Sequence, residues 1–497
     1  MHIFSTLFTA QSVDKELRSP EGLQEAVDWC KASALQKVYI ESFRGNLFVG
    51  QDLLEAVRDR FLEEGFLVCG CVTTTKMRKL SNGWSEIACY SHKPNHELME
   101  SIFRRTAAVF DVIMIDDFLF TDCSCEECGK ARGGRSFDEY HGDVMVEMCL
   151  ERILRPVREV NPSCKIIIKY PQWYEDFQKR GYDVIRQTRN FDMTWGGTET
   201  RDPENERWGR YPQTQAFYMM AWDILLDPEK CGGGWYDPYG TSPDTYLEQA
   251  RQTILGGAKE SVLFCYGSLH NGDEGTKNTE AIRKETAALH KLAYMISGKK
   301  IAGVSVPKAP GRDTEKEKYL SSFYGMLGIP VAPGIALDPG AKSVILGCQA
   351  AGFPDAAVYA KDSIKGNKAV CFSEGFLEYM AMEPLQGALV AHPGNDNWSL
   401  TEMPQPELDE FRNFLLKPFG ISFFAPSKVA LNLYDDDMEI IQNFNDFAVE
   451  VTLDLAGRSP KARSISLVLS EGNEAKMKRD GAKYTIGIPP RTLLAIC

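Results

Sequence analysis

The sequence predicts a (β/α)8 TIM barrel followed by an α/β domain and a C-terminal β-sandwich. Before Gly298, short apolar runs alternate eight times with longer amphipathic stretches, which is the pattern of parallel βα units. Eight units favour a closed barrel over an open doubly wound sheet, which usually has about five or six strands. The chain has 497 residues, and one hydrophobic core rarely serves more than about 300. Further domains are therefore expected after the barrel.

The eight strand candidates of the barrel are apolar runs bounded by turn residues. They span His2–Thr9, Lys37–Phe43, Phe66–Thr73, Phe110–Phe120, Lys165–Tyr170, Phe191–Gly196, Gly233–Tyr236 and Ser261–Tyr266. Runs of this kind fit strands that are buried on both faces, as the strands of a parallel barrel are.

Amphipathic stretches between these runs predict helices. They span Gly22–Ser33, Leu53–Glu64, Glu97–Ala108, Phe137–Val160 and Pro243–Leu255. In the fourth stretch, Val144, Met148, Ile153, Leu154 and Val157 recur at roughly helical spacing, so they share about one face that should pack on the barrel. Ser136 and Ser242 precede two of these stretches as expected caps, and Pro243 takes its favoured place in a first helical turn.

The last 200 or so residues predict two smaller domains. Apolar runs at Ile301–Val306, Ile329–Val331, Ala356–Tyr359 and Lys368–Phe372, with a helix over Glu315–Leu327, indicate a compact α/β domain. The runs Val429–Leu433, Ala448–Leu453, Ser464–Leu469 and Tyr484–Ile488 indicate antiparallel strands of a β-sandwich. The expected domains are residues 1–298, 299–424 and 425–497.

Composition excludes several classes of partner. The formal net charge is -13 and no stripe of Lys and Arg occurs, so we expect no nucleic-acid partner. No run of 18 apolar residues occurs and the N-terminus lacks the pattern of a signal peptide, so we expect no membrane contact and a cytoplasmic protein. Removal of a leader would instead indicate a periplasmic or secreted one. Fourteen scattered cysteines, several inside apolar runs, predict reduced thiols.

Carboxylates occur where four of the predicted strands end, and the active site of a TIM barrel is built at these ends. They are Glu41, the pair Asp116-Asp117, Glu199 and Asp237. Two carboxylates forced together and partly desolvated have their pKa values driven apart, so one can act as a general acid while the other stays ionised. We therefore expect Asp116, Asp117, Glu199 and Asp237 to be catalytic.

Each of these carboxylates also has a structural alternative. One aspartate of the pair can cap the next segment, Glu199 can form an ion pair with Arg201 and no more, and Asp237 can cap a turn or a helix.

Aromatic and charged side chains cluster at the same strand ends. Sugar rings stack their C–H faces on aromatic rings, and sugar hydroxyls need charged or planar partners. The pattern predicts a carbohydrate substrate and no required cofactor; any single tryptophan is more often a packing residue, so the prediction rests on the cluster. The expected substrate-binding residues are Glu41, Arg44, Lys169, Trp173, Trp195, Arg201, Trp235, Tyr236 and His270.

A compact group of thiols follows the fourth predicted strand. Cys123, Cys125 and Cys128 could hold a structural zinc ion together with a fourth ligand such as His141. A strong zinc pattern has two paired spacings and this segment has one, so loop cysteines without metal are the alternative.

The order of barrel, α/β domain and β-domain resembles glycoside hydrolases of family 42. In that family a flavodoxin-like oligomerisation domain and a small β-domain follow the barrel, so the resemblance implies a flavodoxin-like middle domain and a homo-oligomer formed through it. The cysteine cluster and the terminal run Ile488–Ile496 are also similar to that family. The family places Asn-Glu after strand 4 and Glu after strand 7, whereas this chain has Asp116-Asp117 and Asp237.

The stretch Ile115–Phe118 instead resembles the paired aspartates of family 84 N-acetylglucosaminidases. This resemblance implies that Asp116 orients an acetamido group of the substrate and that Asp117 protonates the leaving oxygen.

These observations predict a glycoside hydrolase that cleaves an oligosaccharide or glycoconjugate. Asp117 is the favoured acid, and Glu199 or Asp237 is the base or nucleophile. A noncatalytic carbohydrate-binding barrel would bind sugars without turnover. A metal-dependent hydrolase or lyase would use the cysteines or the acids as ligands.

Overall fold

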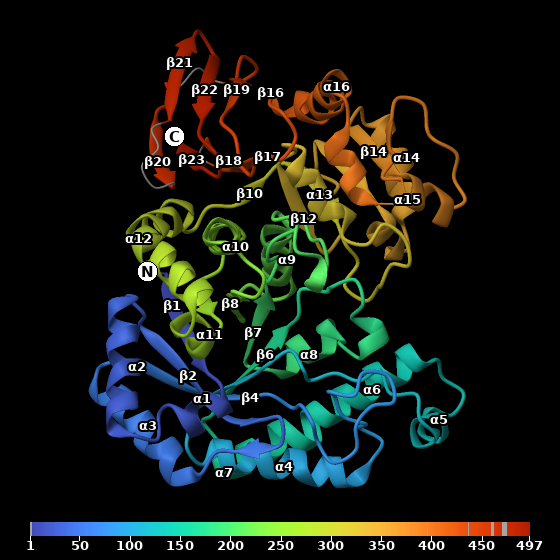
Figure 1. Cartoon of the computed structure of the whole chain (residues 1–497). Helices are drawn as coiled ribbons and strands as arrows, with labels where there is room; N and C mark the ends of the chain where they lie inside the picture. Colours follow the sequence, from blue (N-terminus) through green and yellow to red (C-terminus); the bar gives the residue numbers. More distant parts are fainter. Residues whose placement is uncertain (1, 395, 436, 459–461, 470–474) are drawn as a thin grey trace. The chain divides into compact units, whose positions relative to one another are not determined.

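The computed structural model describes residues 2–394, 396–435, 437–458, 462–469 and 475–497 (Figure 1). The chain forms two compact units. The first contains Met1–Asp202, Leu226–Thr253 and Ala258–Arg283, and the second contains Pro203–Leu225, Ile254–Gly257 and Lys284–Cys497.

The first unit contains the predicted closed barrel. Its parallel strands are β1 (Ile3–Phe8), β2 (Lys37–Arg44), β4 (Leu67–Val72), β5 (Val112–Ile115), β6 (Lys165–Tyr170), β7 (Met193–Gly197), β8 (Cys231–Tyr236) and β9 (Glu260–Leu263). They pair in the order β1-β9-β8-β7-β6-β5-β4-β2, and β1 also pairs with β2, which closes the ring. The short β3 (Leu47–Phe48) adds an antiparallel hairpin to β2. The predicted TIM barrel is confirmed.

Helices connect the barrel strands, and α11 and α12 follow the last of them. They are α1 (Ala10–Lys15), α2 (Pro20–Ala32), α3 (Gln51–Glu63), α4 (Lys93–Ala107), α5 (Glu126–Arg132), α6 (Phe137–Met148), α7 (Arg155–Val160), α8 (Val184–Asn190), α9 (Gln215–Leu226), α10 (Pro243–Leu255), α11 (Tyr266–His270) and α12 (Asp273–Ile296). A capping box between Ser136 and Glu139 starts α6 where the sequence predicts a cap. The helix expected over Phe137–Val160 is divided by a π-helical turn, Cys149–Leu154. Pro156 follows that turn and has no N–H to donate to the preceding turn.

The glycines of β8 make room for an indole inside the barrel. A Cβ atom on Gly232 would lie 2.1 Å from Cη2 of Trp195, and one on Gly233 would lie 2.6 Å from its Nε1. Trp195 is 3% exposed and packs with Leu7, Tyr39 and Trp235 in the barrel core. Gly232 and Gly233 are therefore part of a strand that accommodates a large core side chain.

The second unit contains a parallel sheet in the order β12-β11-β13-β14-β15. Its strands are β11 (Val304–Pro307), β12 (Val331–Gly334), β13 (Ser343–Leu346), β14 (Ala369–Ser373) and β15 (Leu389–Ala391), with helices α13 (Leu320–Met326), α14 (Ala356–Lys365), α15 (Glu374–Tyr379) and α16 (Gln405–Leu416). The expected α/β architecture is confirmed. The prediction differs in detail: Ala356–Tyr359 begins helix α14, and the strands Ser343–Leu346 and Leu389–Ala391 were not expected.

The C-terminal residues form two antiparallel sheets, as the sequence predicts. One has the order β10-β17-β18-β23-β20 and the other β16-β19-β22-β21. Their strands are β10 (Ile301–Ala302), β16 (Ser422–Phe424), β17 (Val429–Tyr434), β18 (Met438–Asn443), β19 (Val449–Asp454), β20 (Ile465–Leu469), β21 (Lys476–Asp480), β22 (Lys483–Ile488) and β23 (Leu493–Ile496). Leu431, Val451 and Ile486 are among the buried residues of the shared core.

One predicted apolar run divides between two sheets. Ile301–Ala302 pairs with β17 of the sandwich, whereas Val304–Pro307 joins the parallel sheet. Gly303 separates the two at a φ of 140°, and a Cβ atom there would lie 2.1 Å from the carbonyl oxygen of Pro330. Glycine is required at this switch because both its conformation and its contact exclude a side chain.

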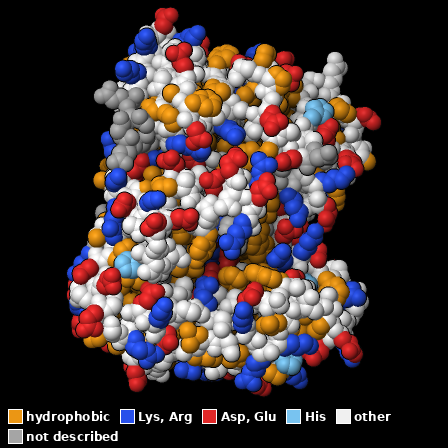
Figure 2. All heavy atoms as spheres, viewed as in Figure 1, with side chains coloured by type: hydrophobic (Ala, Val, Ile, Leu, Met, Phe, Trp, Pro, Cys, Tyr) orange, Lys and Arg blue, Asp and Glu red, His pale blue; other side chains and the backbone are white. Residues whose placement is uncertain are grey.

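On the face of the chain shown in Figure 2, Lys and Arg side chains are interspersed with Asp and Glu. Within the described ranges, no helix combines the length and the apolar character that crossing a bilayer requires. All fourteen cysteines are free thiols, including the buried Cys69, Cys71, Cys265 and Cys371.

Candidate active site

The C-terminal ends of five barrel strands supply a group of charged side chains, here called the charged cluster. It consists of Glu41, Arg44, Asp116, Asp117, Lys169, Glu199, Arg201 and Asp237. Because parallel strands in a closed ring end at the same rim, residues up to 196 positions apart in the chain meet here. All four carboxylates expected to be catalytic belong to this cluster.

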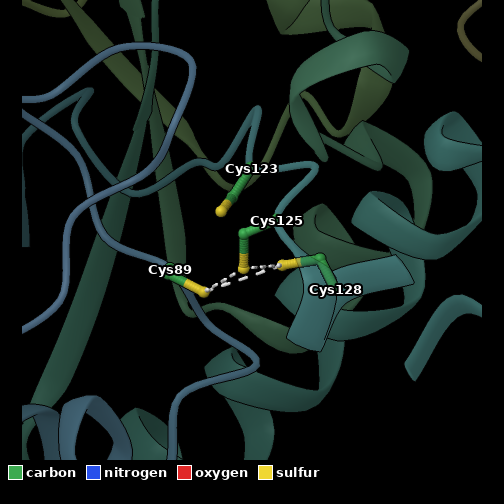
Figure 3. A group of neighbouring side chains, drawn as sticks. All are labelled: Cys89, Cys123, Cys125 and Cys128. Carbon is green, nitrogen blue, oxygen red and sulfur yellow. Dashed lines mark hydrogen bonds between the residues drawn. The ribbon is translucent and has the colours of Figure 1, made fainter. Parts of the chain in front are cut away.

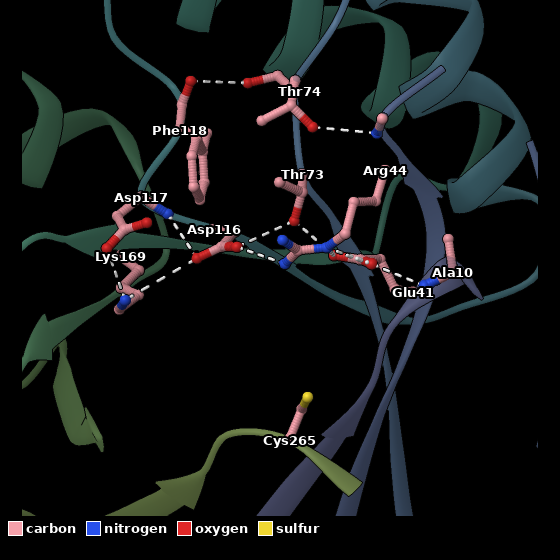
Figure 4. Close-up of polar contacts among 12 residues, drawn as sticks. Ala10, Glu41, Arg44, Thr73, Thr74, Asp116, Asp117, Phe118, Lys169 and Cys265 are labelled. Atoms are coloured by element: carbon pink, nitrogen blue, oxygen red, sulfur yellow. Dashed lines mark hydrogen bonds and ion pairs between the residues drawn. The ribbon is translucent and has the colours of Figure 1, made fainter. Parts of the chain in front are cut away.

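Asp116 is held by three neighbours (Figure 4). Nη2 of Arg44 lies 2.7 Å from its Oδ2, the hydroxyl of Thr73 donates to the same oxygen at 3.0 Å, and the N–H of Asp117 donates to Oδ1 at 2.8 Å. Arg44 and Thr73 also donate to Glu41, which is completely buried. Glu41 therefore orients Arg44 and Thr73 toward Asp116.

Lys169 links the second aspartate to Glu199. Its Nζ lies 2.7 Å from Oδ2 of Asp117 and 2.5 Å from Oε1 of Glu199. The other oxygen of Glu199, Oε2, is buried and has no hydrogen-bond partner among the described residues. Asp117 has a side chain that is 17% exposed, against 3% for Asp116 and for Glu199. Asp117 is therefore the member of this group most open to a substrate.

Asp237 is fixed by a two-pronged ion pair. Nε and Nη2 of Arg201 lie 2.8 Å and 2.6 Å from its two oxygens, and the N–H of Tyr239 donates to Oδ1 at 3.2 Å. Arg201 has a φ of 56°, and Gln249 accepts from its N–H at 3.1 Å. This pairing orients the carboxylate of Asp237 through both of its oxygens.

The two adjacent aspartates have opposite electrostatic environments. Burial acts to raise the pKa of Asp116, but Arg44, Lys169 and the N–H of Asp117 together hold this pKa below its usual value. Burial, together with the charges of Asp116 and Glu199, raises the pKa of Asp117 to about 7 against the opposing charge of Lys169. Burial also raises the pKa of Glu199, against the charge of Lys169. Near neutral pH, Asp116 is ionised while Asp117 can carry a proton.

Four aromatic side chains, here called the aromatic wall, extend from the paired aspartates. Phe118 follows Asp117 directly, and its ring lies beside the aspartates in Figure 4. Trp84 stacks on Phe118 and Phe120, with centroid separations of 5.5 Å and 5.8 Å, and Trp173 contacts Phe120 at 5.0 Å. Trp173 was expected at the site. Trp84 was not, because it lies in a long loop far from any strand end.

Four more residues were expected to bind substrate and lie in or around the barrel: Trp235, Trp195, Tyr236 and His270. Trp235 stacks on Phe264 beneath Lys169, whose Nζ lies 4.3 Å from the indole centroid. The remaining three are not brought to the acids. Trp195 is in the barrel core, and Tyr236, the next residue after Trp235, points to the other side of the strand and packs on Tyr246 of α10.

His270 is the third expected binding residue that does not reach the acids. It stacks on Tyr266, and its Nε2 lies 3.1 Å from Oε1 of Glu25 in helix α2. A strand end gives a position along the chain, but strand alternation and the following helix decide which way a side chain points.

Four cysteines converge into the four-cysteine cluster: Cys89 from the loop before α4, Cys123 and Cys125 from the segment before α5, and Cys128 from α5 itself (Figure 3). Their sulfur atoms all lie within 4.8 Å of one another. Three of the Sγ–Sγ distances are 3.6 to 3.7 Å. A tetrahedral zinc ion with Zn–S bonds of about 2.3 Å places its sulfurs about 3.8 Å apart. The cluster can therefore hold a structural metal ion such as zinc.

The fourth thiol of this cluster is Cys89, and the expectation that His141 supplies the fourth ligand is wrong. The ring nitrogens of His141 lie 2.9 Å and 3.1 Å from the carbonyl oxygens of Lys179 and Cys123. Cys89 was missed because it stands alone in sequence, 34 residues before Cys123. Within the described parts of the chain, this is the one group of His, Cys, Asp and Glu that is arranged to hold a metal ion.

Comparison with known protein families gives a direct assignment. The model of a family described as "Probable glycosyl hydrolase, catalytic domain" matches residues 1–309, which include the whole barrel. The chain belongs to this glycosyl hydrolase family. An uncharacterised protein of Saccharolobus solfataricus is 24% identical over 357 residues. That match covers 64% of this chain and 58% of the relative, so the chain spans less than two thirds of the relative's length.

Solved structures share the three-part architecture of this chain. A catalytic mutant of a family 42 β-galactosidase from G. stearothermophilus has a TM-score of 0.64 at 11% identity, with 98% of each chain covered. A family 42 exo-carrageenase from Bacteroides ovatus has a TM-score of 0.54 at 11% identity, with 100% of this chain and 79% of that chain covered. At such identities the likeness concerns the fold.

Proposed function

We propose that this glycosyl hydrolase cleaves an oligosaccharide or glycoconjugate with the carboxylates of the charged cluster. The observation that carries the proposal is the contrast between Asp116 and Asp117, since adjacent carboxyls with opposite environments provide one ionised group and one proton donor. The aromatic wall beside them supports a sugar substrate, because sugar C–H faces stack on such rings.

In this proposal Asp117 is the general acid. It is the more exposed of the two aspartates, and its pKa of about 7 keeps a large fraction protonated near neutral pH. Asp116 stays ionised and positions Asp117 through the N–H of the latter. Lys169 donates to Asp117, so it holds the carboxyl in place and stabilises the carboxylate that remains after proton transfer.

Glu199 is the favoured nucleophile and Asp237 the alternative. Nζ of Lys169 lies 2.7 Å from an oxygen of Asp117 and 2.5 Å from an oxygen of Glu199, so these two oxygens are at most about 5.2 Å apart. Retaining glycosidases separate their two carboxyls by about 5 to 5.5 Å. Oε2 of Glu199 has no hydrogen-bond partner among the described residues, whereas both oxygens of Asp237 are engaged by Arg201. This spacing favours retention of configuration.

The reaction then has two steps. In the first, Asp117 gives its proton to the glycosidic oxygen while the carboxylate of Glu199 attacks the anomeric carbon, and the leaving sugar departs. In the second, Asp117 takes a proton from water, which displaces Glu199 from the anomeric carbon. The carboxylates of the charged cluster outnumber its cations, which stabilises the positive charge that develops on the sugar ring.

A panel of aryl glycosides tests the proposal. β-Galactosides come first, since the proteins of similar fold include a β-galactosidase. We expect the full chain to release the aryl alcohol from at least one glycoside. We also expect Asp116→Asn, Asp117→Asn, Glu199→Gln and Asp237→Asn each to reduce the rate. Full activity in all four variants would contradict the proposal. Sugar binding by calorimetry without any turnover would instead favour a noncatalytic carbohydrate-binding barrel.

We further propose that the four-cysteine cluster holds a structural zinc ion. Cys89 comes from the loop that carries Trp84, and Cys123 comes from the loop that carries Phe118, so metal binding would join the two loops of the aromatic wall.

Elemental analysis of the purified chain is expected to find one zinc per chain. Cys89→Ser is expected to lose it and to lower the midpoint of thermal unfolding by roughly 5 to 10 °C. The matched variant Cys164→Ser removes a buried thiol outside the cluster and should keep the zinc. The proposal would be disproved by a purified wild-type chain that contains no zinc and unfolds at the same temperature as Cys89→Ser.

A further inference from the structure

Arg180 is a cation at the end of the aromatic wall, and no acidic side chain among the described residues forms an ion pair with it. Its Cζ lies 4.9 Å from the ring centroid of Trp173 and 5.4 Å from that of Phe120. Its backbone is fixed, because its N–H donates to Phe177 and its carbonyl accepts from Thr121. In the described structure its guanidinium makes no hydrogen bond and no ion pair, although it is only half-exposed. The other arginines at this rim, Arg44 and Arg201, are both bound to carboxylates.

The guanidinium of Arg180 lies over the rings of Trp173 and Phe120, so its N–H groups remain available to a ligand. A guanidinium carries five N–H donors in one plane. Two parallel N–H groups match the two oxygens of a carboxylate or of a sulfate ester. The aromatic rings also remove water from one face of the cation, so an anion bound there interacts more strongly than at a fully solvated arginine.

The position of Arg180 relative to the acids indicates which sugar unit would carry the anion. The wall begins at Phe118, next to Asp117, and continues through Trp84 and Phe120 to Trp173, where Arg180 lies. The charged cluster has five carboxylates and three cations, so an anionic group on the unit being cleaved would be repelled. An acidic unit is therefore favoured further along the wall and disfavoured at the cleavage point.

We propose that Arg180 binds the carboxylate or sulfate of an acidic sugar, in a unit that neighbours the cleaved one. This inference rests on the proposed glycoside hydrolase function, and it narrows the substrate class to acidic oligosaccharides or acidic glycoconjugates. Trp173 and Phe120 hold the guanidinium, and Trp84, which is 40% exposed, offers a stacking surface to the intervening sugar.

Calorimetric binding tests this inference without requiring turnover. The probes are an oligogalacturonide, a sulfated galactan oligosaccharide and a neutral galacto-oligosaccharide of the same length, each titrated into Asp117→Asn and into the same variant carrying Arg180→Gln. We expect one of the acidic probes to bind more tightly than the neutral one. Arg180→Gln should then weaken that acidic probe by about 10- to 100-fold, the loss expected when a charged hydrogen bond is removed. It should weaken the neutral probe far less.

Two variants serve as controls. Arg186→Gln removes an equal charge from an arginine that is paired with Asp183 and Asp143, so it should leave acidic-probe binding unchanged. Arg180→Lys keeps the charge but loses the paired N–H groups, and should restore binding in part. Equal losses for acidic and neutral probes in Arg180→Gln, or tighter binding of the neutral probe by the unaltered site, would overturn the inference while leaving the hydrolase proposal intact. The acidic probe that responds identifies uronate or sulfate as the anion.

Discussion

Asp117→Asn is expected to lower kcat/KM for a glycoside with a poor leaving group by about 100- to 10,000-fold, the contribution of a general acid. The same variant should lose much less activity on a dinitrophenyl glycoside, because that leaving group departs without needing a proton. This difference between substrates separates the loss of a proton donor from general damage to the site. Steady-state kinetics on leaving groups of graded pKa measure it, and equal losses on all of them would contradict the assigned role.

The pH dependence gives an independent check of the same role. Asp117 is active as an acid only while it is protonated, and its pKa is raised to about 7. The kcat/KM of the wild-type chain is therefore expected to fall as the pH rises above about 7, whereas Asp117→Asn should lack this fall. A wild-type profile that stays flat up to pH 9 would exclude Asp117 as the acid.

The stability of the variant shows whether the loss comes from misfolding. The pKa of Asp117 is higher in the folded chain than the usual value of an aspartate, so the wild-type chain loses stability as the pH rises between those two values. Asp117→Asn carries no such charge, and its thermal midpoint at pH 8 should equal or exceed that of the wild type. A lower midpoint would attribute the loss of activity to the fold.

Glu199→Gln is expected to reduce turnover on the order of 10,000-fold or more, because no covalent intermediate can form without the nucleophile. Added azide should restore part of the rate by attacking the anomeric carbon from the vacated face, which gives a glycosyl azide of inverted configuration. Product analysis by proton NMR identifies it. The wild-type chain should release its first product with retained configuration, as the spacing of Asp117 and Glu199 indicates.

Two further variants serve as controls for Glu199→Gln. Asp237→Asn should cost less and should not respond to azide, because Asp237 is engaged by Arg201 through both oxygens. Azide rescue of Asp237→Asn in place of Glu199→Gln would transfer the role of nucleophile to Asp237. Glu260→Gln is the matched control: Glu260 is a buried acid paired with Lys37 at 2.9 Å, at the start of β9. Its loss should affect stability rather than turnover, because the N-terminal ends of barrel strands carry no catalytic groups.

The sequence predicted the elements whose residue types are decided by burial alone. Strands of a barrel are covered on both faces, so they appear as apolar runs, and all eight occur where the runs were found. The abrupt end of Val112–Ile115 in two aspartates likewise marked a strand end at the rim. Short runs are ambiguous, however. Ala356–Tyr359 is apolar enough for a strand but begins a helix, because four residues are too few to distinguish the two periods.

Contacts between loops were not predictable in the same way. Trp84 and Cys89 lie in a long loop between β4 and α4, where no periodic pattern relates a residue to its partners on other loops. The direction of a side chain was also undetermined: Trp195 and Tyr236 occur near strand ends, yet one fills the barrel core and the other packs under α10. The bridge from Lys169 to both Asp117 and Glu199 involves three strands that the sequence cannot bring into register.

The sequence by itself therefore determined the barrel, the order of the parts that follow it, and the charged residues at its rim, because hydrophobic periodicity and strand ends are local properties. Only the tertiary structure decided which of these residues meet, which cation bridges which acids, and that Cys89 joins the other three thiols. Those contacts depend on ring closure and on the paths of loops, and both arise from packing between residues that are far apart in the chain.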